Sequence, residues 1–204
     1  MSRSNWKGSS GWGSVDDPTG VLGDICLHAS SGIGQLCEDY LIQEIGTSNA
    51  FNKVHYRVQC DMAYTIDENF NGSVSLVARA SNYTTSVKKP YIAQNGYIGV
   101  IDFATSTAQI IRRFDAKDYL LFSVSVEQSI LPNTKNTISL SCYGNAGEGK
   151  TSLVLEVNGN SIANCVDASG QQLLLGDAGL QVQNGSVYIN NFAIMELDSS
   201  GKAV

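Results

Sequence analysis

The stretch Gly179-Leu-Gln-Val-Gln-Asn-Gly-Ser-Val-Tyr-Ile-Asn-Asn-Phe-Ala-Ile-Met-Glu-Leu197 decides the fold class of this chain. It reads as two strands on either side of Asn184-Gly185, a pair that suits the positive backbone angles of a tight hairpin. After the pair, Val187 and Ile189 recur with the two-residue period of a strand. The stretch therefore predicts a hairpin that closes an all-β fold.

The chain from residue 40 onward repeats this pattern, with short β-rich runs and no helical segment of useful length between them. The runs are 40–45, 53–64, 73–80, 97–103, 108–114, 119–126, 137–142, 152–157 and 161–166. Turn signals fall at Asn71-Gly72, Asn95-Gly96, Pro132-Asn133 and Asn158-Gly159. This spacing is typical of antiparallel sandwiches built from sequential hairpins. Residues 20–35 fit either a short helix or a long loop.

The closing stretch resembles the last hairpin of concanavalin A-like (laminin G-like) sandwiches, which often carries Gly-Leu-Gln, Gly-x-Val and Asn-aromatic patterns. The segment 73–82 resembles a further strand of that superfamily, Gly-Leu-x-Ala-Arg-Ala, and the segment 97–103 resembles the strand after it. The resemblance covers residues 40–197 and implies an antiparallel two-sheet jelly-roll sandwich, to which the composition of residues 1–20 adds an extended N-terminal arm. In many members the concave sheet or its loops hold a glycan, so the resemblance makes glycan binding an expectation.

Length and composition indicate one main domain. The 204 residues, 43% of them hydrophobic, suffice for one large core. We expect a flexible arm at residues 1–20, rich in Gly and Ser, a sandwich domain at 21–198 and a tail at 199–204. Both tryptophans, Trp6 and Trp12, lie in the arm. Such rings anchor well in pockets, either on this sandwich or on a neighbouring subunit.

Charge and cysteine usage exclude several classes. A net charge of -6 argues against binding nucleic-acid phosphates. No run approaches the roughly 18 to 20 apolar residues of a membrane span, and the N-terminus has no signal-peptide core. We therefore expect a soluble protein made in the cytosol. The 5 cysteines form no Cys-x-x-Cys pair, which favours buried thiols over zinc or a disulfide framework. No metal or other cofactor is expected.

Two motifs imitate ligand loops without the context that those loops need. The segment 144–151 matches the phosphate-binding pattern Gly-x-x-x-x-Gly-Lys-Thr, but a β-rich run follows in place of a helix. The segment 67–72 copies the first half of an EF-hand calcium loop, but Ala78 stands where the bidentate glutamate belongs. We interpret the first as a loop between strands and the second as a polar hairpin turn.

Catalysis is not expected. Glycoside hydrolysis needs two carboxyl groups about 5 to 10 Å apart, whereas Glu38 and Glu44 would lie roughly 20 Å apart along a strand. His28 and His55 have no serine or cysteine partner that spacing alone singles out. The closing hairpin also lacks the histidine that many hydrolase-like relatives of the superfamily carry after Gly-Leu-Gln.

Glycan binding would use aromatic platforms flanked by amides. The candidate side chains come from segments expected to be loops or strand ends, where tyrosines also serve as ordinary packing. They are Tyr83, Tyr91, Tyr97, Tyr143, Asn82 and Asn95.

The leading hypothesis is a non-catalytic binding or structural module, a capsid decoration or fibre-associated protein on the surface of a phage or virus particle. In that role the arm bearing Trp6 and Trp12 would attach to neighbouring subunits, or to copies in a homo-oligomer, while the sandwich contacts host glycan. The first alternative is a free, secreted carbohydrate-binding lectin module. The second alternative is a remote glycosidase-like enzyme.

Overall fold

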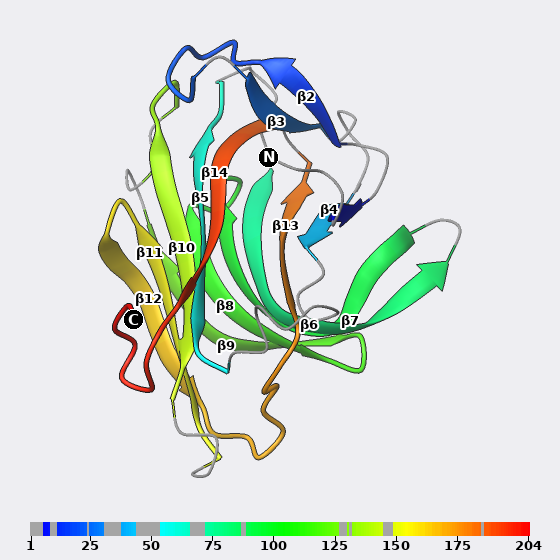
Figure 1. Cartoon of the computed structure of the whole chain (residues 1–204), viewed down its shortest axis with the longest axis vertical. Helices are drawn as coiled ribbons and strands as arrows, with labels where there is room; N and C mark the ends of the chain where they lie inside the picture. Colours follow the sequence, from blue (N-terminus) through cyan, green and yellow to red (C-terminus); the bar gives the residue numbers. More distant parts are fainter. Residues whose placement is uncertain are drawn as a thin grey trace.

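The protein is a sandwich of two antiparallel β-sheets, seen in a computed structural model (Figure 1). The structure describes residues 6–8, 12–23, 25–30, 38–43, 54–65, 72–86, 89–126, 130, 132–144, 149–184 and 186–204. Within this part of the chain no helix is long and apolar enough to cross a membrane.

Sheet A has the strand order β1-β4-β13-β6-β7-β8-β9. Its strands are β1 (Trp6–Gly8), β4 (Glu38–Gln43), β6 (Ser73–Ser86), β7 (Lys89–Asp102), β8 (Thr107–Phe114), β9 (Lys117–Ser125) and β13 (Asp177–Gln183). Sheet B has the order β12-β11-β10-β5-β14-β3-β2. Its strands are β2 (Trp12–Asp16), β3 (Ile25–Ser30), β5 (Tyr56–Ala63), β10 (Asn136–Tyr143), β11 (Thr151–Val157), β12 (Asn160–Asp167) and β14 (Ser186–Glu196).

The main core lies between the sheets, because every second residue of the facing strands is apolar. On β6, Val74 and Leu76 are fully buried in this core, and on β10 so is Leu140. The expected jelly-roll sandwich is thereby confirmed, and the nine runs predicted from the sequence all correspond to strands. The residues between the core positions point to the opposite face of each sheet.

The closing segment is an arch between sheets, and the predicted hairpin is wrong at this point. β13 belongs to sheet A and pairs with β4 and β6, whereas β14 belongs to sheet B and pairs with β3 and β5. Asn184 has the expected positive φ of 49°. Local turn chemistry therefore fixed the reversal, but it did not fix which strands hydrogen-bond.

Two further predictions need correction. Asn95-Gly96 makes no turn, because both residues lie inside the continuous strand β7, where Gly96 pairs with Arg113. Residues 25–30 form β3, neither a helix nor a long loop. The alternation of β3 was hidden because apolar residues cover both of its faces: Cys26 packs into a small outer cluster and Leu27 against the main core.

The described parts of the N-terminal arm complete the two sheets. β1 pairs with β4 at one edge of sheet A, and β2 pairs with β3 at one edge of sheet B. Trp12 packs against the main core of its own sandwich. Its indole Nε1 is buried without a hydrogen-bond partner. The intramolecular alternative therefore describes Trp12, and partner anchoring by Trp6 remains a prediction.

Gly72 packs tightly against the backbone at the end of β13, where the chain leaves sheet A for sheet B. It lies between β5 and β6, and a Cβ on it would come within 2.4 Å of the Gln183 carbonyl oxygen and 2.6 Å of that of Asn184. We expect Gly72→Ala to lower the free energy of unfolding by about 1–3 kcal/mol, because the backbone must shift to make room for the new methyl group. Urea denaturation measures the change.

The matched control is Gly13→Ala on β2, where a Cβ meets nothing within 4 Å. It should change the free energy of unfolding by no more than about 0.5 kcal/mol. Equal effects of the two variants would contradict the close packing of Gly72 against the backbone of Gln183 and Asn184.

Candidate functional site

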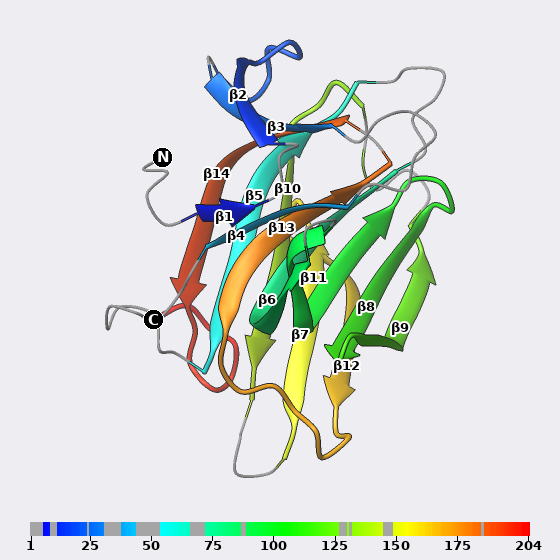
Figure 2. The same cartoon turned by 90° about the vertical axis from the view of Figure 1, so that its right-hand side faces the viewer.

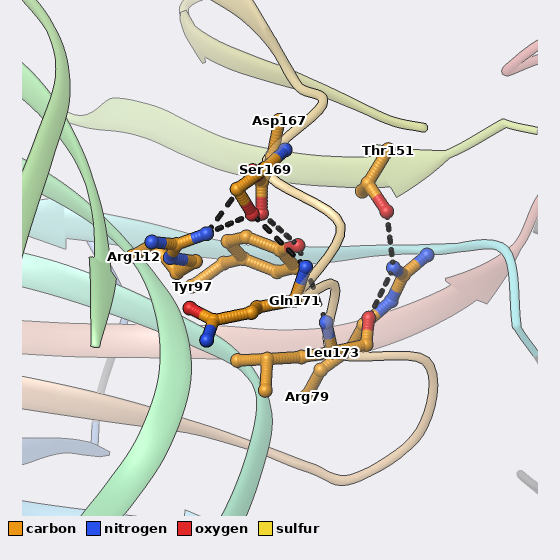
Figure 3. Close-up of polar contacts among 8 residues, drawn as sticks. All are labelled: Arg79, Tyr97, Arg112, Thr151, Asp167, Ser169, Gln171 and Leu173. Atoms are coloured by element: carbon orange, nitrogen blue, oxygen red, sulfur yellow. Dashed lines mark hydrogen bonds and ion pairs between the residues drawn. The ribbon is translucent and has the colours of Figure 1, made fainter. Parts of the chain in front are cut away.

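Two polar groupings stand out among the described residues, one between the sheets and one on the outer face of sheet A. The first joins Arg79, Tyr97 and Arg112 of sheet A to Thr151 and Asp167 of sheet B (Figure 3). The segment 168–176, which links β12 to β13, supplies Ser169 and Leu173. We call this grouping the inter-sheet clamp.

Asp167 is the acceptor at the centre of one half of the clamp. The Tyr97 hydroxyl donates to its Oδ2 at 2.7 Å, and the guanidinium of Arg112 lies 3.4 Å from its Oδ1. The Ser169 amide also donates to Oδ1 at 3.0 Å. Burial alone would raise the pKa of Asp167, but the hydrogen bonds from Ser169 and Tyr97, with the charge of Arg112, hold that pKa below its usual value.

Arg79 forms the other half of the clamp, although its side chain is only 1% exposed. A register shift between Ala78 and Ser81 puts Arg79 at a φ of 53° and turns its side chain into the interior. Its guanidinium donates to Thr151 Oγ1 at 3.0 Å and to the Leu173 carbonyl oxygen at 2.6 Å. Carbonyl and hydroxyl dipoles thus solvate a buried cation.

We interpret the clamp as structural, because its hydrogen bonds are made within the chain and all its members except Ser169 are buried. This burial corrects one predicted glycan contact: Tyr97 is 0% exposed, lies mid-strand in β7 and donates to Asp167. Asn95 is also structural, since its Oδ1 accepts the Asp115 amide at 2.9 Å and fixes the turn between β8 and β9. Tyr97 is therefore not available to a sugar, and the glycan contact expected of Asn95 stays a prediction.

The other predicted tyrosines lie in two places. Asn82 and Tyr83 belong to β6 and Tyr91 to β7, so the structure brings these three positions into one two-stranded ribbon, which extends beyond the sandwich (Figure 1). Their side chains are outside the described part of the structure. Tyr143 ends β10 on sheet B, with Gly201 of the C-terminal segment packed against its ring. The six predicted residues therefore do not form one site.

The outer face of sheet A carries the second grouping, which sequence reasoning missed. Cross-strand pairing aligns two rows of side chains over β13, β6, β7, β8 and β9. The first row is Gln183, Ser73, Asp102, Thr107 and Ser125, and the second is Gln181, Ser75, Val100, Gln109 and Ser123. We call these two rows the polar ladder. Its signal in the sequence was the alternation of Ser73 and Ser75 with core residues.

Sheet A curls toward this outer face. β7 contacts β1 and β4, although β13 and β6 lie between them in the sheet. Because sheet B covers the inner face, the curl must bring these strands together across the outer face, and Figure 1 shows the matching bend of β6 and β7. The polar ladder therefore lies on a concave face.

The side chains of the polar ladder become more exposed from β13 toward β9. At its inner end Gln181 is 4% exposed and Ser75 is 2% exposed, whereas Ser123 and Ser125 on β9 are exposed. The side-chain carbonyl oxygen of Gln181 is buried without a hydrogen-bond partner. Beside the ladder runs an apolar row of Val77, Ile98 and Ile111.

The outer face of sheet B is also polar, but its charged groups satisfy one another. Arg57 donates to Ser141 Oγ at 2.9 Å and forms an ion pair with Glu156 at 3.0 Å. Asp61 accepts from Thr137 at 2.6 Å and from Asn191 at 2.8 Å. The charged side chains on this face of sheet B are therefore already engaged with one another.

The structure does not give either ligand-loop motif the flanking elements that such a loop needs. Lys150 is followed by strand β11 and no helix, as expected, and residues 145–148 lie outside the described part. The EF-hand-like segment 67–72 is described only at Gly72, and it joins strands of different sheets, so the predicted hairpin turn is wrong.

Other candidate ligands likewise form no site. Glu38 lies in β4, and Glu44 is outside the described residues. His28 stacks on Tyr188, with ring centroids 4.8 Å apart. The described residues include no group of three His, Cys, Asp or Glu side chains that could hold a metal ion.

The described cysteines behave as packing residues. Cys60 and Cys142 are fully buried in the main core, Cys26 is buried in the outer cluster, and all are free thiols. Burial raises the pKa of Cys142 to about 11, although the nearby charge of Arg79 acts in the opposite direction. Such thiols are protonated and unreactive near neutral pH. Cys37 lies outside the described part.

Solved structures with a similar architecture include a carbohydrate-binding module, a legume lectin-like domain and a glycan-bound lumenal domain. The carbohydrate-binding module CBM66 from Bacillus subtilis aligns with a TM-score of 0.65 at 14% identity, over 95% of this chain and 96% of that one. The legume lectin-like domain from Entamoeba histolytica aligns with a TM-score of 0.60 at 11% identity, over 95% and 90%. The Ca²⁺/Man3GlcNAc-bound exoplasmic/lumenal domain of VIP36 aligns with a TM-score of 0.56 at 8% identity, over 91% and 83%.

These likenesses establish the fold, which is the concanavalin A-like β-sandwich expected from the sequence. At 8 to 14% identity they establish nothing finer. No protein-family model matches the sequence, and no match was found among curated proteins.

Removing one hydroxyl group from the inter-sheet clamp should lower the free energy of unfolding. Tyr97→Phe removes the hydroxyl that donates to Asp167 and accepts from the Leu173 amide. We expect a loss of about 1–3 kcal/mol in the free energy of unfolding, because buried partners stay unsatisfied. Urea denaturation tests this, with Tyr143→Phe as the control. Equal stability of the two variants would contradict the role of the Tyr97 hydroxyl.

The lowered pKa of Asp167 predicts a pH-dependent contribution to stability. Its stabilisation is present above the usual aspartate pKa of 3.8 and is lost as pH falls through the lower pKa of the folded state. Asp167→Asn should therefore be less stable than the natural protein at pH 7, and the difference should shrink toward pH 2. Denaturation at a series of pH values measures it, and a difference independent of pH would refute the assignment.

Proposed function

We propose that the protein is a non-catalytic carbohydrate-binding module that holds a glycan on the concave outer face of sheet A. The observation that carries the proposal is the polar ladder, with an unpartnered carbonyl oxygen on Gln181 at its inner end. The similarity of the fold to carbohydrate-binding domains supports it. The leading hypothesis from the sequence, a subunit on a phage or virus particle, has no support from these similarities and remains a prediction, whereas they support its first alternative, a carbohydrate-binding module.

The chemistry of the ladder suits the chemistry of sugars. A pyranose or furanose ring presents several hydroxyl groups, each both a donor and an acceptor, and one or more apolar C–H faces. Gln109 and Thr107 offer amide and hydroxyl groups, and Asp102 adds a carboxylate whose Oδ1 already accepts the Ala104 amide. The apolar Val100 lies within the same row and next to Ile98 and Ile111. A few convergent polar groups beside apolar surface are typical of small-ligand sites.

The polarity of the face also favours an oxygen-rich ligand on energetic grounds. A buried acceptor without a partner costs about 1–3 kcal/mol. A hydroxyl that donates to the Gln181 carbonyl oxygen would remove this cost. Because a sugar hydroxyl can donate to Gln181 while accepting from a neighbour, it satisfies such a surface better than an apolar ligand does.

A glycan array with the full-length protein tests the proposal, followed by titration calorimetry on the best ligand. Gln109→Ala should weaken binding of that ligand about tenfold or more, because removal of a partner from a polar ligand contact costs about 1–3 kcal/mol. Gln109 is half-buried, and its only described side-chain hydrogen bond is a long one of 3.4 Å to Thr107, so the variant should fold normally.

The matched control is Gln59→Ala on β5. Gln59 lies between the core residues Val58 and Cys60, so it faces outward from sheet B, on the far side of the sandwich. This variant should bind the glycan as the natural protein does. A clean negative on the array, or equal losses for both variants, would overturn the proposed site.

A further inference from the structure

The open edge of sheet A carries large apolar side chains. β9 is the last strand in the order of this sheet, and residues 117–120 are all exposed. Leu120 is 60% exposed, Tyr119 41% and Phe122 36%. An exposed apolar edge strand with unpaired backbone groups is a template for pairing with another strand, and proteins usually protect such edges.

The edge of sheet B lies beside the edge of sheet A. β12 is the last strand of sheet B, and it lies against β9 (Figures 1 and 2). Val166 on β12 is 55% exposed, but it faces outward from sheet B, because its neighbours Cys165 and Asp167 face the interior. With the 9 residues of β9 rising ~3.3 Å each, the two edges form a wall about 30 Å long.

We propose that a second copy of this chain binds this wall, with the two β9 strands antiparallel about a two-fold axis near Leu120. The edge of an antiparallel strand is self-complementary under such an axis. In this register Leu120 faces its own copy, and Tyr119 faces Leu121 of the second copy. The two sheets A then continue into each other.

Charge favours a second copy over a charged partner. The whole chain has a net charge of -6, which opposes self-association over most of its surface. β9 differs, because it carries one cation, Lys117, and one carboxylate, Asp118, which already pairs with Arg113 at 2.6 Å. In the proposed register Lys117 faces Ser123 of the second copy and Asp118 faces Phe122 of the second copy. No like charges oppose each other.

One irregularity shapes this interface. The pairing of β9 with β8 shifts register between Ile110 and Ile111, so Leu121 is an extra residue on the β9 side. The bulge shortens the regular backbone ladder next to the axis. The apolar contact of Leu120 with its own copy therefore contributes more to the dimer than backbone hydrogen bonds do.

The dimer has a consequence for binding, which rests on the proposed function. Residues opposite each other in an antiparallel pair share one face of the sheet. The polar ladders of the two copies therefore open on the same side. Two linked sites of this kind raise the avidity for a multivalent surface by about 10²–10⁴-fold without any new contact.

Sedimentation velocity of the full chain over a concentration series tests the dimer directly. The natural protein should form a dimer. Leu120→Lys and Leu120→Glu should each weaken dimerisation at least about tenfold, because like charges then face each other across the axis. An equimolar mixture of the two variants should recover the dimer, since opposite charges meet. The control Leu175→Lys, at a side chain 47% exposed in the segment 168–176, should leave the dimer unchanged.

The opposite results would overturn the proposal. They are a natural protein that stays monomeric at the highest attainable concentration, a dimer that survives Leu120→Lys, or a mixture of variants that remains monomeric. Binding of a single soluble sugar, measured on the Leu120→Lys monomer, separates this proposal from the proposed function. Loss of the dimer with unchanged sugar affinity supports both, whereas a dimer in a protein that binds no sugar refutes only the proposed function.

Discussion

The burial of two guanidinium groups and one carboxylate between the sheets is the constraint on which the rest of the structure depends. A charge in such a place is tolerated only when it is fully paired or hydrogen-bonded. Arg112 and Tyr97 stabilise the Asp167 carboxylate, and backbone carbonyl oxygens accept from the terminal nitrogens of Arg79, although the Nε atoms of both arginines are buried without a partner. These bonds fix the segment 168–176 across the end of the sandwich and keep sheets A and B in one relative position.

The same alternation that builds the core also builds the outer face of sheet A. Since successive side chains of a strand point to opposite faces, each core residue of β6, β7, β8 and β13 is followed by one that faces outward. Where these outward residues are Val77 and Ile98, they form a small second apolar cluster. Where they are serine, threonine and glutamine, they form the polar ladder. The curl of the sheet then makes that polar surface concave.

Strands and some turns could be predicted from the sequence because they depend on local chemistry. Asn158-Gly159 forms the predicted turn, with φ angles of 53° and 78°, between the paired strands β11 and β12. Asn184-Gly185 shows the limit: its backbone reversal is local, but the partner of each flanking strand depends on the whole sandwich. At Asn95-Gly96 the pairing of β7 with both neighbours overrides a strong turn signal.

The candidate site was harder to predict than the fold. Tyrosines draw attention as sugar platforms, yet Tyr97 proved to be a buried donor between the sheets. Its role depends on Asp167, which is 70 residues away in sequence, so no local pattern reveals it. The polar ladder had the opposite difficulty, because a serine or glutamine between core residues looks like an ordinary solvent-facing position. Only the register of five strands shows that these residues align.

The most direct test of the account is amide hydrogen exchange of the full chain with and without its best glycan ligand. A glycan on the concave face should slow exchange on β6, β7, β8 and β13, where the backbone lies beneath the polar ladder. Exchange on β5 and β10 of sheet B, on the far side, should stay unchanged. Protection confined to sheet B, or to the loops at the end of the sandwich, would contradict a glycan site on the concave face of sheet A.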